Sequence, residues 1–378
     1  MADPLWTSDE IVASTGGRLI GAAFEVSGVS IDTRSTEPGD LFVALAGVRD
    51  GHEFLGQAVA AGAVGALVSQ DGPGPAVRVD DTLKALEKLG IEARNRSTAL
   101  RCAVTGSVGK TTVTQAIAAG LRLAGQAHSS VKSYNNHIGV PLTLARMPRT
   151  TERAVFEVGM NHADEITPLS KMIAPDVVVV TTVGPVHTEN FPDGEAGVAK
   201  AKAEIFAGLK PGGVAVLPAG NKWFPVLKAA ADQAGARVVT FGTAPDCDAR
   251  LLSFQAQHVE AWVQGHRVSF ALRQSADHWG LTSLCILLAL EAMAVPRDLA
   301  LVALSDFEPL EGRGAEKTVR GFTLIDESYN ANPISMASAI RTLGARRVSG
   351  RRIVALTDML ELGADGPGFH AAIARDLD

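Results

Sequence analysis

The stretch RCAVTGSVGKTTVTQAIAAGLRL, residues 101–123, joins an apolar run to a helical pattern through a glycine-containing turn. Residues Arg101–Thr105 predict a buried strand, and Lys110–Leu123 predict a helix. The helix carries apolar residues at helical spacing, namely Val113, Ile117, Leu121 and Ala124. The turn GSVGK would direct its backbone N–H groups and the positive end of the helix dipole at an anion. This stretch therefore predicts a phosphate-binding site between a strand and a helix.

The turn matches the P-loop pattern GxxxxGK[ST] only in part, because the first glycine of that pattern would fall at Val104. In a P-loop, Lys110 would reach the terminal phosphates of ATP, and the hydroxyl of Thr111 would ligate magnesium. The alternative is an ordinary glycine turn with a solvated lysine. Gly-Lys-Thr directly after an apolar strand favours the P-loop, whose expected ATP-binding residues are Gly106, Ser107, Val108, Gly109, Lys110, Thr111 and Thr112.

Apolar runs alternate with helical patterns after residue 100, which predicts an α/β fold. Near-continuous apolar strands are typical of a parallel sheet that helices cover on both faces. The runs are CAVTG, AVFEVGM, DVVVVTTVG, GVAVLP and RVVTFG.

Changes in this rhythm predict three domains, residues 1–96, 97–310 and 311–378. The first is a small α/β unit that opens with a helix, since Thr7 and Glu10 have the spacing of a capping box. We expect that helix to end at the glycine pair 16–17.

The third section contains the predicted strands FTLIDES and RIVALTD and a helix that begins at Pro333 after the capping residue Asn332. Two strands are too few for a complete doubly wound sheet. We therefore expect a partial domain between Glu311 and Asp378.

The composition favours small-molecule chemistry. A chain of 378 residues with a formal net charge of -6 offers no positive field for a nucleic-acid backbone. Its three cysteines are far apart and form no CxxC pair, which is typical of a reducing compartment. The N-terminal residues do not resemble a signal peptide, and the apolar run Cys285–Val295 is too short to span a bilayer. We expect a cytoplasmic monomer with no membrane insertion.

Two polar residues follow predicted parallel strands. Glu157 ends the strand AVFEV, where a carboxylate could hold magnesium together with Thr111. His187 follows the strand DVVVVTTVG. Each residue taken alone is more often structural, but polar groups at adjacent strand ends indicate one crevice.

Six further motifs cover most of the chain in order: SYNNHIGVPLTL, FEVGMNHADEI, TTVGPVHTENF, AKAEIF, DESYNANPISM and TDMLELG. With them the sequence resembles the Mur ligase family of peptidoglycan synthesis, whose P-loop has the shorter form TGxxGKT. The resemblance implies a UDP-binding N-terminal domain, a central P-loop ATPase domain and a Rossmann-like C-terminal domain. It also implies ATP and Mg²⁺ as cofactors.

Within that family the motifs are most similar to the members that add D-alanyl-D-alanine to UDP-N-acetylmuramoyl-tripeptide. The implied reaction is ATP-dependent amide formation through an acyl phosphate, in cell wall synthesis. Two other interpretations stay open. One is a sister ligase or a folylpolyglutamate synthase-like ligase, and the other is a nucleotide-binding module without turnover.

The resemblance also implies roles for residues at the ATP site. It places Lys110, His187 and Lys202 in catalysis, and Glu157 and His187 at the metal ions. Lys202 would be the carbamylated lysine that helps to bind a second magnesium, with Lys200 as the competing candidate. From its position in a helix alone, Lys202 would be expected on a solvated face.

The remaining expected contacts lie toward the substrates. By resemblance, Thr33 and Arg34 would contact the UDP end, and Asn135 and Asn136 the substrate or its phosphates, although an Asn pair before glycine and proline is also ordinary loop chemistry. Arg313 would reach ATP, and a nucleotide and acceptor-side loop would contain Asp326, Tyr329, Asn330 and Asn332. One departure concerns the family's HxxxN linker, because Thr282 stands four residues after His278. Contact with adenine at that position is in question.

Overall fold

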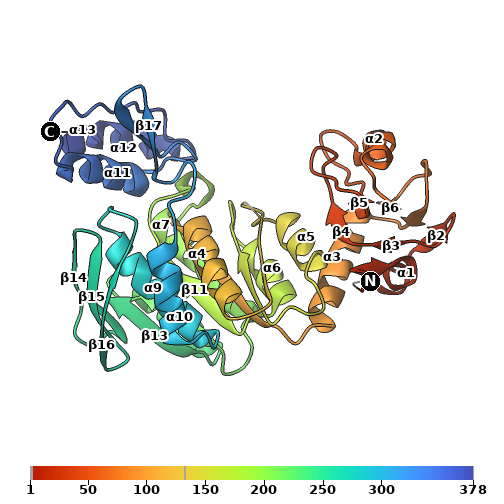
Figure 1. The fold of residues 1–378 in the computed structure, drawn as a ribbon, viewed down its shortest axis with the longest axis horizontal. Helices are drawn as coiled ribbons and strands as arrows, with labels where there is room; N and C mark the ends of the chain where they lie inside the picture. The colour runs from red at the N-terminus through yellow and green to blue at the C-terminus, as the bar shows by residue number, and fades with distance from the viewer. Residues whose placement is uncertain (1–2, 132, 378) are drawn as a thin grey trace. The chain divides into compact units, whose positions relative to one another are not determined.

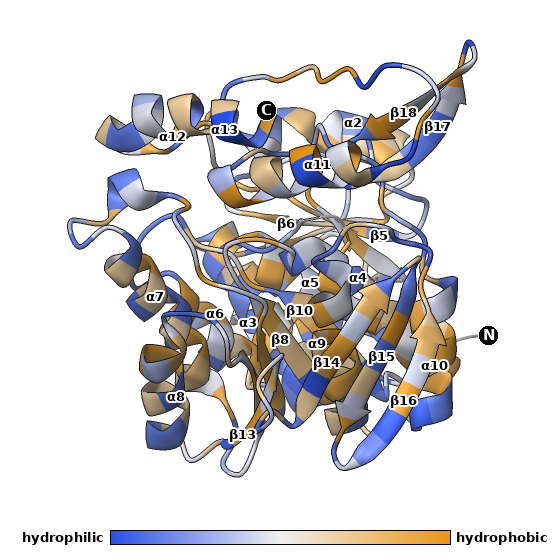
Figure 2. Cartoon of the chain, turned by 90° about the vertical axis from the view of Figure 1, so that its left-hand side faces the viewer, coloured by the Kyte–Doolittle hydropathy of each residue, from blue (hydrophilic) through white to orange (hydrophobic). Residues whose placement is uncertain are grey.

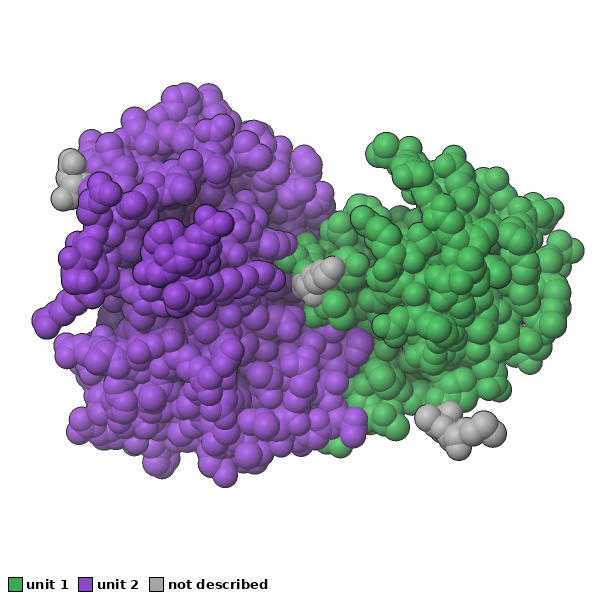
Figure 3. Space-filling view, turned by 45° about the horizontal axis from the view of Figure 1, so that its top comes forward, with its two compact units in different colours: residues 1–99, 130–152 green, residues 100–129, 153–378 purple. Residues whose placement is uncertain are grey.

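The computed structural model describes residues 3–131 and 133–377 of the chain (Figure 1). They form two compact units, which Figure 3 colours separately. Unit 1 comprises residues 1–99 and 130–152, and unit 2 comprises residues 100–129 and 153–378. Within the described ranges, every helix is too short or too polar to span a bilayer.

Unit 1 is built on a small mixed sheet that helices cover. Its described strands lie in the order β2 (Arg18–Ile20), β7 (Ala76–Arg78), β6 (Gly65–Val68), β5 (Asp40–Val43) and β4 (Gly28–Ser30). The β2–β7 pair is antiparallel and the other pairs are parallel. A short antiparallel pair is formed by β1 (Trp6–Thr7) and β3 (Glu25–Val26). The helices are α1 (Ser8–Thr15), α2 (Leu55–Ala60), α3 (Thr82–Asn95) and α5 (Gly139–Ala145).

The predicted first helix is confirmed at both ends. Thr7 and Glu10 form the capping box, each side chain accepting a hydrogen bond from the other residue's backbone N–H. Gly16 ends the helix with φ +76°, a left-handed conformation that glycine adopts without strain.

The core of unit 1 combines segments that are distant in the sequence. Trp6 is fully buried and donates a hydrogen bond from Nε1 to the carbonyl of Ala145, 2.8 Å away. Leu142 and Ala145 of α5 belong to the same buried cluster as Leu86 of α3. The segment 130–152 therefore completes the core of unit 1, although unit 2 strands flank it in the sequence.

Unit 2 contains a large sheet that is mostly parallel, as predicted. Its nine described strands lie in the order β16 (His266–Ala271), β15 (His258–Val263), β14 (Ala249–Gln255), β13 (Arg237–Gly242), β12 (Val214–Pro218), β11 (Val177–Val180), β8 (Leu100–Thr105), β10 (Arg153–Glu157) and β9 (Ala127–Ser129). The two pairs among β14, β15 and β16 are antiparallel, and all other pairs are parallel. Because β8 lies between β10 and β11, the carboxyl ends of these three strands are adjacent.

Helices cover both faces of this sheet (Figure 2). One face carries α4 (Lys110–Leu123), α9 (Trp279–Ala292) and α10 (Arg297–Asp306), and the other carries α6 (Ile166–Ile173), α7 (Glu195–Ala203) and α8 (Phe224–Gln233). Helix α4 has the predicted bounds.

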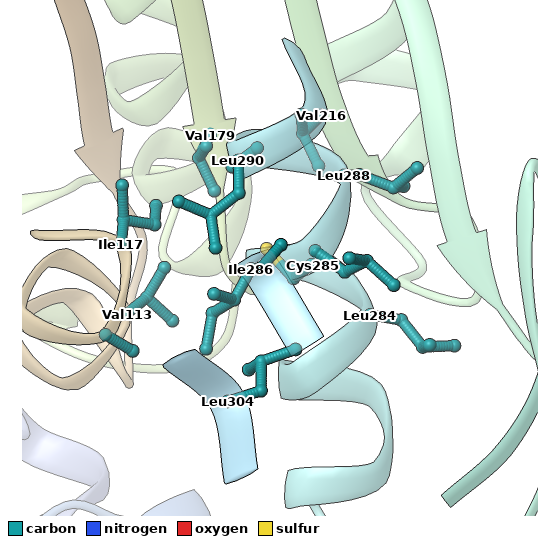
Figure 4. Close-up of a cluster of buried hydrophobic side chains, with 14 of the residues drawn as sticks. Val113, Ile117, Val179, Val216, Leu284, Cys285, Ile286, Leu288, Leu290 and Leu304 are labelled. Atoms are coloured by element: carbon teal, nitrogen blue, oxygen red, sulfur yellow. The ribbon is translucent and has the colours of Figure 1, made fainter. Parts of the chain in front are cut away.

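Helix α9 contains most of the apolar run that was expected to be too short for a membrane. Residues 283–290 of this helix are all buried, which is typical of a helix enclosed within a protein. Figure 4 shows Ile286, Leu288 and Leu290 of this helix in one cluster with Val113 and Ile117 of α4, Leu304 of α10, and Val179 and Val216 of the sheet.

The C-terminal section differs from the prediction at one strand. The segment FTLIDES forms β18 (Phe322–Asp326), which pairs antiparallel with β17 (Ala315–Val319). The expected strand RIVALTD, residues 352–358, is wrong, because the structure has neither helix nor strand there. Ile353 is 77% exposed and no described strand pairs with this segment, so its apolar pattern has no sheet to join.

Helices and a small apolar cluster complete that section. The predicted helix is confirmed as α11 (Pro333–Ala345), and α12 (Gly366–Ala372) and α13 (Ala374–Leu377) follow. Ile340, Met359, Leu362 and Ile373 form the cluster.

Candidate functional site

The loop between β8 and α4 has the geometry of a phosphate cradle. Gly106 and Gly109 adopt φ values of +151° and +84°, which a side chain would disfavour. Gly109 caps α4 without a side-chain hydrogen bond to the first turn of that helix. The N–H groups of that turn and the helix dipole are therefore arranged to receive an anion. The half-buried Lys110 donates from Nζ to the carbonyl of Gly106 at 2.9 Å.

The loop that follows β11 holds the phosphate loop in place. Ser107 N donates to the carbonyl of Thr182 at 2.8 Å, and the Ser107 hydroxyl both donates to and accepts from the backbone of Gly184. The hydroxyl of Thr181 donates to the carbonyl of Val108 at 2.5 Å. The sequence reasoning missed these contacts, since TTVG by itself predicts only the end of a strand.

Asn221 supports this second loop from the end of β12. Its amide nitrogen donates to the hydroxyl of Thr182 at 3.2 Å and to the carbonyl of Val183 at 2.8 Å. Its position shortly beyond a buried strand was the one signal in the sequence that could have indicated it.

Glu157 ends β10 and is almost fully buried, with 1% of its surface exposed. Burial lowers the pKa of Lys110, the carboxylate of Glu157 raises it, and the charge of Arg313 lowers it, with a downward net shift. The charges of both Glu157 and Arg313 therefore act on the lysine of the phosphate loop.

Lys202 and Lys200 lie in the same helix but in opposite environments. Lys202 is 2% exposed, and burial together with the charge of Lys110 lowers its pKa well below the ordinary lysine value. Lys200 is exposed and pairs with Asp193 at 2.8 Å. The expectation from helix position alone, a solvated Lys202, is therefore wrong.

His187 follows β11 in a left-handed conformation with φ +57°. Its Nδ1 atom forms an ion pair with the carboxylate of Glu361. Burial lowers the pKa of His187, Glu361 raises it, and the charges of Lys110 and Lys202 lower it, so that the net shift is downward. Charge interactions therefore link Lys110 with Glu157, His187 and Lys202, and the first three of these residues lie at or after the carboxyl ends of the adjacent strands β8, β10 and β11.

Hard oxygen ligands suit magnesium, and the Thr111 hydroxyl and the Glu157 carboxylate supply that chemistry beside the phosphate loop. No group of three or more His, Cys, Asp or Glu side chains in the described ranges is arranged to hold a metal ion. A magnesium site here would therefore include a hydroxyl, phosphate oxygens or a modified lysine among its ligands.

Two candidates near the C-terminal section, Tyr329 and Asp326, contact Arg313 or its neighbour Gly312. The guanidinium of Arg313 lies over the ring of Tyr329, with Cζ 4.0 Å from the ring centroid. Asp326 accepts hydrogen bonds from the backbone of Gly312 and from Ser328, whose side-chain bond is the main cause of the lowered pKa of Asp326. Asn330 accepts a hydrogen bond from the N–H of Ala331.

Asn332 caps α11 and is mostly buried. Its Oδ1 atom accepts hydrogen bonds from the N–H groups of Ile334 and Ser335 at 3.1 and 3.0 Å. The side-chain oxygen of Asn332 is therefore occupied by the cap of α11. At the linker position, Thr282 donates to the carbonyl of His278, and His278 Nδ1 lies 3.2 Å from the hydroxyl of Ser338.

The remaining candidates belong to unit 1. Arg34 is exposed and forms a two-pronged ion pair with Asp32, and the Thr33 hydroxyl lies 3.5 Å from Oε1 of Gln57. Asn136 accepts hydrogen bonds from the N–H groups of Ile138 and Gly139 before α5, and Asn135 precedes it in the same loop. All four residues belong to unit 1, whereas the other candidates belong to unit 2.

The chain matches two family models, the Mur ligase middle domain over residues 104–285 and the Mur ligase family catalytic domain over residues 25–107. It is 34% identical to the UDP-N-acetylmuramoyl-tripeptide--D-alanyl-D-alanine ligase of Bacillus subtilis (strain 168), an alignment that covers 96% of this chain and 81% of that ligase. It is also 34% identical to the ligase of the same name from Escherichia coli (strain K12), covering 98% and 82% of the two chains. A crystal structure of MurF from Acinetobacter baumannii superimposes with a TM-score of 0.89 at 28% identity, covering 99% of this chain and 83% of that one.

Proposed function

The chain belongs to the Mur ligase family, and we propose that it adds D-alanyl-D-alanine to UDP-N-acetylmuramoyl-tripeptide with hydrolysis of ATP to ADP and phosphate. One observation carries the proposal from the structure. Lys110 of the phosphate loop interacts electrostatically with Glu157, which ends the adjacent strand β10, and with His187 and Lys202.

The reaction has two steps. An oxygen of the tripeptide carboxylate bonds to the γ-phosphorus of ATP, and ADP leaves with the electrons of the broken P–O bond. The amine of D-alanyl-D-alanine then attacks the acyl carbon, phosphate leaves, and the amine loses a proton. The first step brings two anions together, so the site has to neutralise charge more than it has to move protons.

The protein supplies positive charge through fixed groups. The N–H groups at the start of α4 would cradle the phosphates, and Lys110 would leave the carbonyl of Gly106 to reach the β- and γ-phosphates. Arg313 would approach the nucleotide from its stacked position on Tyr329. Asp326, the last residue of β18, and Asn330, in the loop after that strand, would complete the nucleotide contacts.

The residues present fit magnesium. Thr111 and Glu157 would hold one ion, and His187 and a carbamylated Lys202 would hold a second. Bound magnesium would supply Lewis-acid stabilisation of the phosphoryl oxygens.

Lys202 has the properties that carbamylation requires. Its buried amine has a pKa well below the ordinary lysine value, so that more of it is in the neutral, nucleophilic form at neutral pH. Attack of the neutral Nζ on CO₂ forms an N–C bond and releases one proton, which turns the buried amine into a carbamate with a negatively charged carboxylate. Lys200 is exposed and ion-paired, and is the weaker candidate.

The other predicted contacts stay within this proposal. Thr33, Arg34, Asn135 and Asn136 would bind the UDP-linked substrate, and Tyr329 and Asn332 would lie toward the acceptor. The domains would be residues 1–96 for the UDP substrate, 97–310 for ATP and 311–378 for the C-terminal ligase part, with residues 130–152 of the second range packed into the core of unit 1. We further propose that the protein acts as a cytoplasmic monomer, and size-exclusion chromatography with light scattering can test its oligomeric state.

An ADP-release assay tests the function directly. The protein is incubated with ATP and Mg²⁺, and UDP-N-acetylmuramoyl-tripeptide and D-alanyl-D-alanine are each omitted in turn. Release that needs both substrates supports the proposal. Diaminopimelate, lysine and glutamate as acceptors test for sister and folylpolyglutamate synthase-like ligases. If the protein binds nucleotide but releases no ADP with any acceptor, the proposed ligase activity is contradicted.

A further inference from the structure

We propose that Glu361 is a positioning residue for His187, holding the imidazole so that its Nε2 atom is presented to the phosphate and metal region. This inference rests on the proposed function, in which His187 serves the second metal ion. It assigns a task to a residue of TDMLELG for which the sequence indicated none.

The contact between the two side chains is specific. The Nδ1 atom of His187 forms an ion pair with the carboxylate of Glu361, and within residues 3–131 and 133–377 it has no regular hydrogen bond to any other group. The His187 side chain is 18% exposed and that of Glu361 is 49% exposed. The carboxylate therefore lies on the more exposed side of the contact, and the charges of Lys110 and Lys202 act on the buried imidazole.

Both residues have unusual backbone conformations. His187 has φ +57° and Glu361 has φ +61°, and neither is glycine. Residues held in the left-handed region are strained, and such strain persists only where surrounding contacts impose it. Two strained residues that meet through their side chains indicate a contact that the fold maintains.

The segment that carries Glu361 is firmly anchored. Met359 and Leu362 are each 4% exposed and pack with Ile340 and Ile373. The N–H of Met359 donates to Nε2 of His370 at 3.0 Å, and Nδ1 of that ring lies 2.8 Å from the carbonyl of Gly366. Glu361 is therefore an exposed residue on a fixed backbone.

The same segment packs closely against the turn that follows His187. Gly363 has φ +59°, and a Cβ atom there would lie 3.1 Å from Cβ and 3.2 Å from Cα of Glu189. A larger residue at position 363 would push the two backbones apart. The close approach brings the carboxylate of Glu361 within reach of the imidazole.

The chemistry of histidine explains what the contact achieves. A carboxylate at Nδ1 favours the tautomer with its proton on Nδ1, which leaves the lone pair of Nε2 for a metal ion or a hydrogen-bond donor. It also fixes the plane of the ring. Removal of a group that hydrogen-bonds the other ring nitrogen of a metal-binding histidine typically lowers metal affinity or activity by about 10–100-fold.

The test compares Glu361→Ala and Glu361→Gln with Asp365→Asn as a matched control. Asp365 is an exposed acid four residues further along the same segment, so its replacement makes the same change in charge. The nine histidines are labelled with ¹⁵N, and His187→Gln assigns the signals of His187 in the metal-free protein. We expect a protonated Nδ1 and an unprotonated Nε2 in the wild type and in Asp365→Asn. We expect a mixture of tautomers in Glu361→Ala and an intermediate state in Glu361→Gln.

Kinetics complete the test. In the ADP-release assay, Glu361→Ala should lower kcat by about 10–100-fold. The double variant His187→Ala/Glu361→Ala should be no slower than His187→Ala alone, because Glu361 acts through His187. A wild-type tautomer in Glu361→Ala, or additive losses in the double variant, would overturn the inference. Failure of the proposed function would appear separately, because the wild-type protein would then release no ADP. The NMR experiment would still test the contact between Glu361 and His187.

Discussion

The ammonium group of Lys110 donates a hydrogen bond to the carbonyl of Gly106, four residues earlier in the same loop, at 2.9 Å. This hydrogen bond joins the two ends of the phosphate loop. When ATP binds, the ammonium group would leave the carbonyl and contact the phosphates. We expect Lys110→Ala to lower ADP release by about 100-fold or more, as for a lost charge-stabilising donor. Lys200→Ala, which removes an exposed lysine paired with Asp193, should retain activity. Unchanged ADP release in Lys110→Ala would refute the P-loop assignment.

Gly106 permits the phosphate loop to lie against the loop that follows β11. A Cβ atom at this position would overlap the hydroxyl of Thr181, and the backbone has φ +151°. Gly106→Ala should therefore lower the free energy of unfolding by about 1–3 kcal/mol and weaken ATP binding. Urea unfolding and calorimetric titration with ATP measure the two effects.

A matched control separates overlap from backbone strain. Gly194 has φ +56°, and a Cβ atom added there would have no neighbour within 4 Å, so Gly194→Ala tests strain alone. We expect the smaller loss of stability in Gly194→Ala. Adding Thr181→Ala to Gly106→Ala should recover part of the loss, and no recovery would argue against the steric explanation.

Lys202 should reduce the stability of the protein at neutral pH. Because burial lowers its pKa in the folded state, the unfolded chain binds the proton more readily between the folded and unfolded pKa values. This loss in the free energy of unfolding is fully present below the pKa that Lys202 has in the folded state. It disappears as the pH rises toward the ordinary lysine pKa of about 10.4. In bicarbonate-free buffer, Lys202→Met should raise Tm by roughly a few degrees at pH 7, and the gain should shrink toward pH 10.

The same variant should abolish ADP release, so that stability and activity move in opposite directions. Lys200→Met provides the control, because Lys200 is exposed. It should change neither Tm nor its pH dependence. A lower Tm for Lys202→Met at pH 7 would show that Lys202 is stabilised by its surroundings.

Asn332 combines an observed structural role with a predicted acceptor-side role, and two substitutions can separate them. Asn332→Ala removes the cap of α11 and should cost about 1 kcal/mol, with faster hydrogen exchange across that helix. Asn332→Ser keeps an effective cap but removes the amide, so stability should be retained. A loss of activity in Asn332→Ser would support a substrate contact, and full activity would leave only the cap.

Patterns among neighbouring residues were sufficient to predict several helices and strands. The bounds of α4, the capping box at Thr7 and Glu10, and the helix that begins at Pro333 depend on periodicity and capping, which neighbouring residues determine. The parallel sheet followed from its continuous apolar runs. These features needed no knowledge of distant contacts.

Features that depend on distant contacts were harder to predict. Burial of Lys202 depends on segments that a helix pattern does not reveal, and the family resemblance indicated only a metal-binding role for this residue. RIVALTD has the composition of a strand, but no described strand lies beside it to pair with. Glu361 meets His187 across 174 positions of sequence, so neither residue alone predicts the contact.

The tryptophan near the N-terminus limits how the protein could be dissected. The indole of Trp6 donates to the carbonyl of Ala145, and α5 supplies Leu142 to the same core. A fragment that stops at residue 99 would leave the indole N–H without its acceptor and an apolar surface exposed to water. Expression of unit 1 by itself would require residues 130–152 to be joined to residues 1–99, since two separate segments of the sequence build one compact unit.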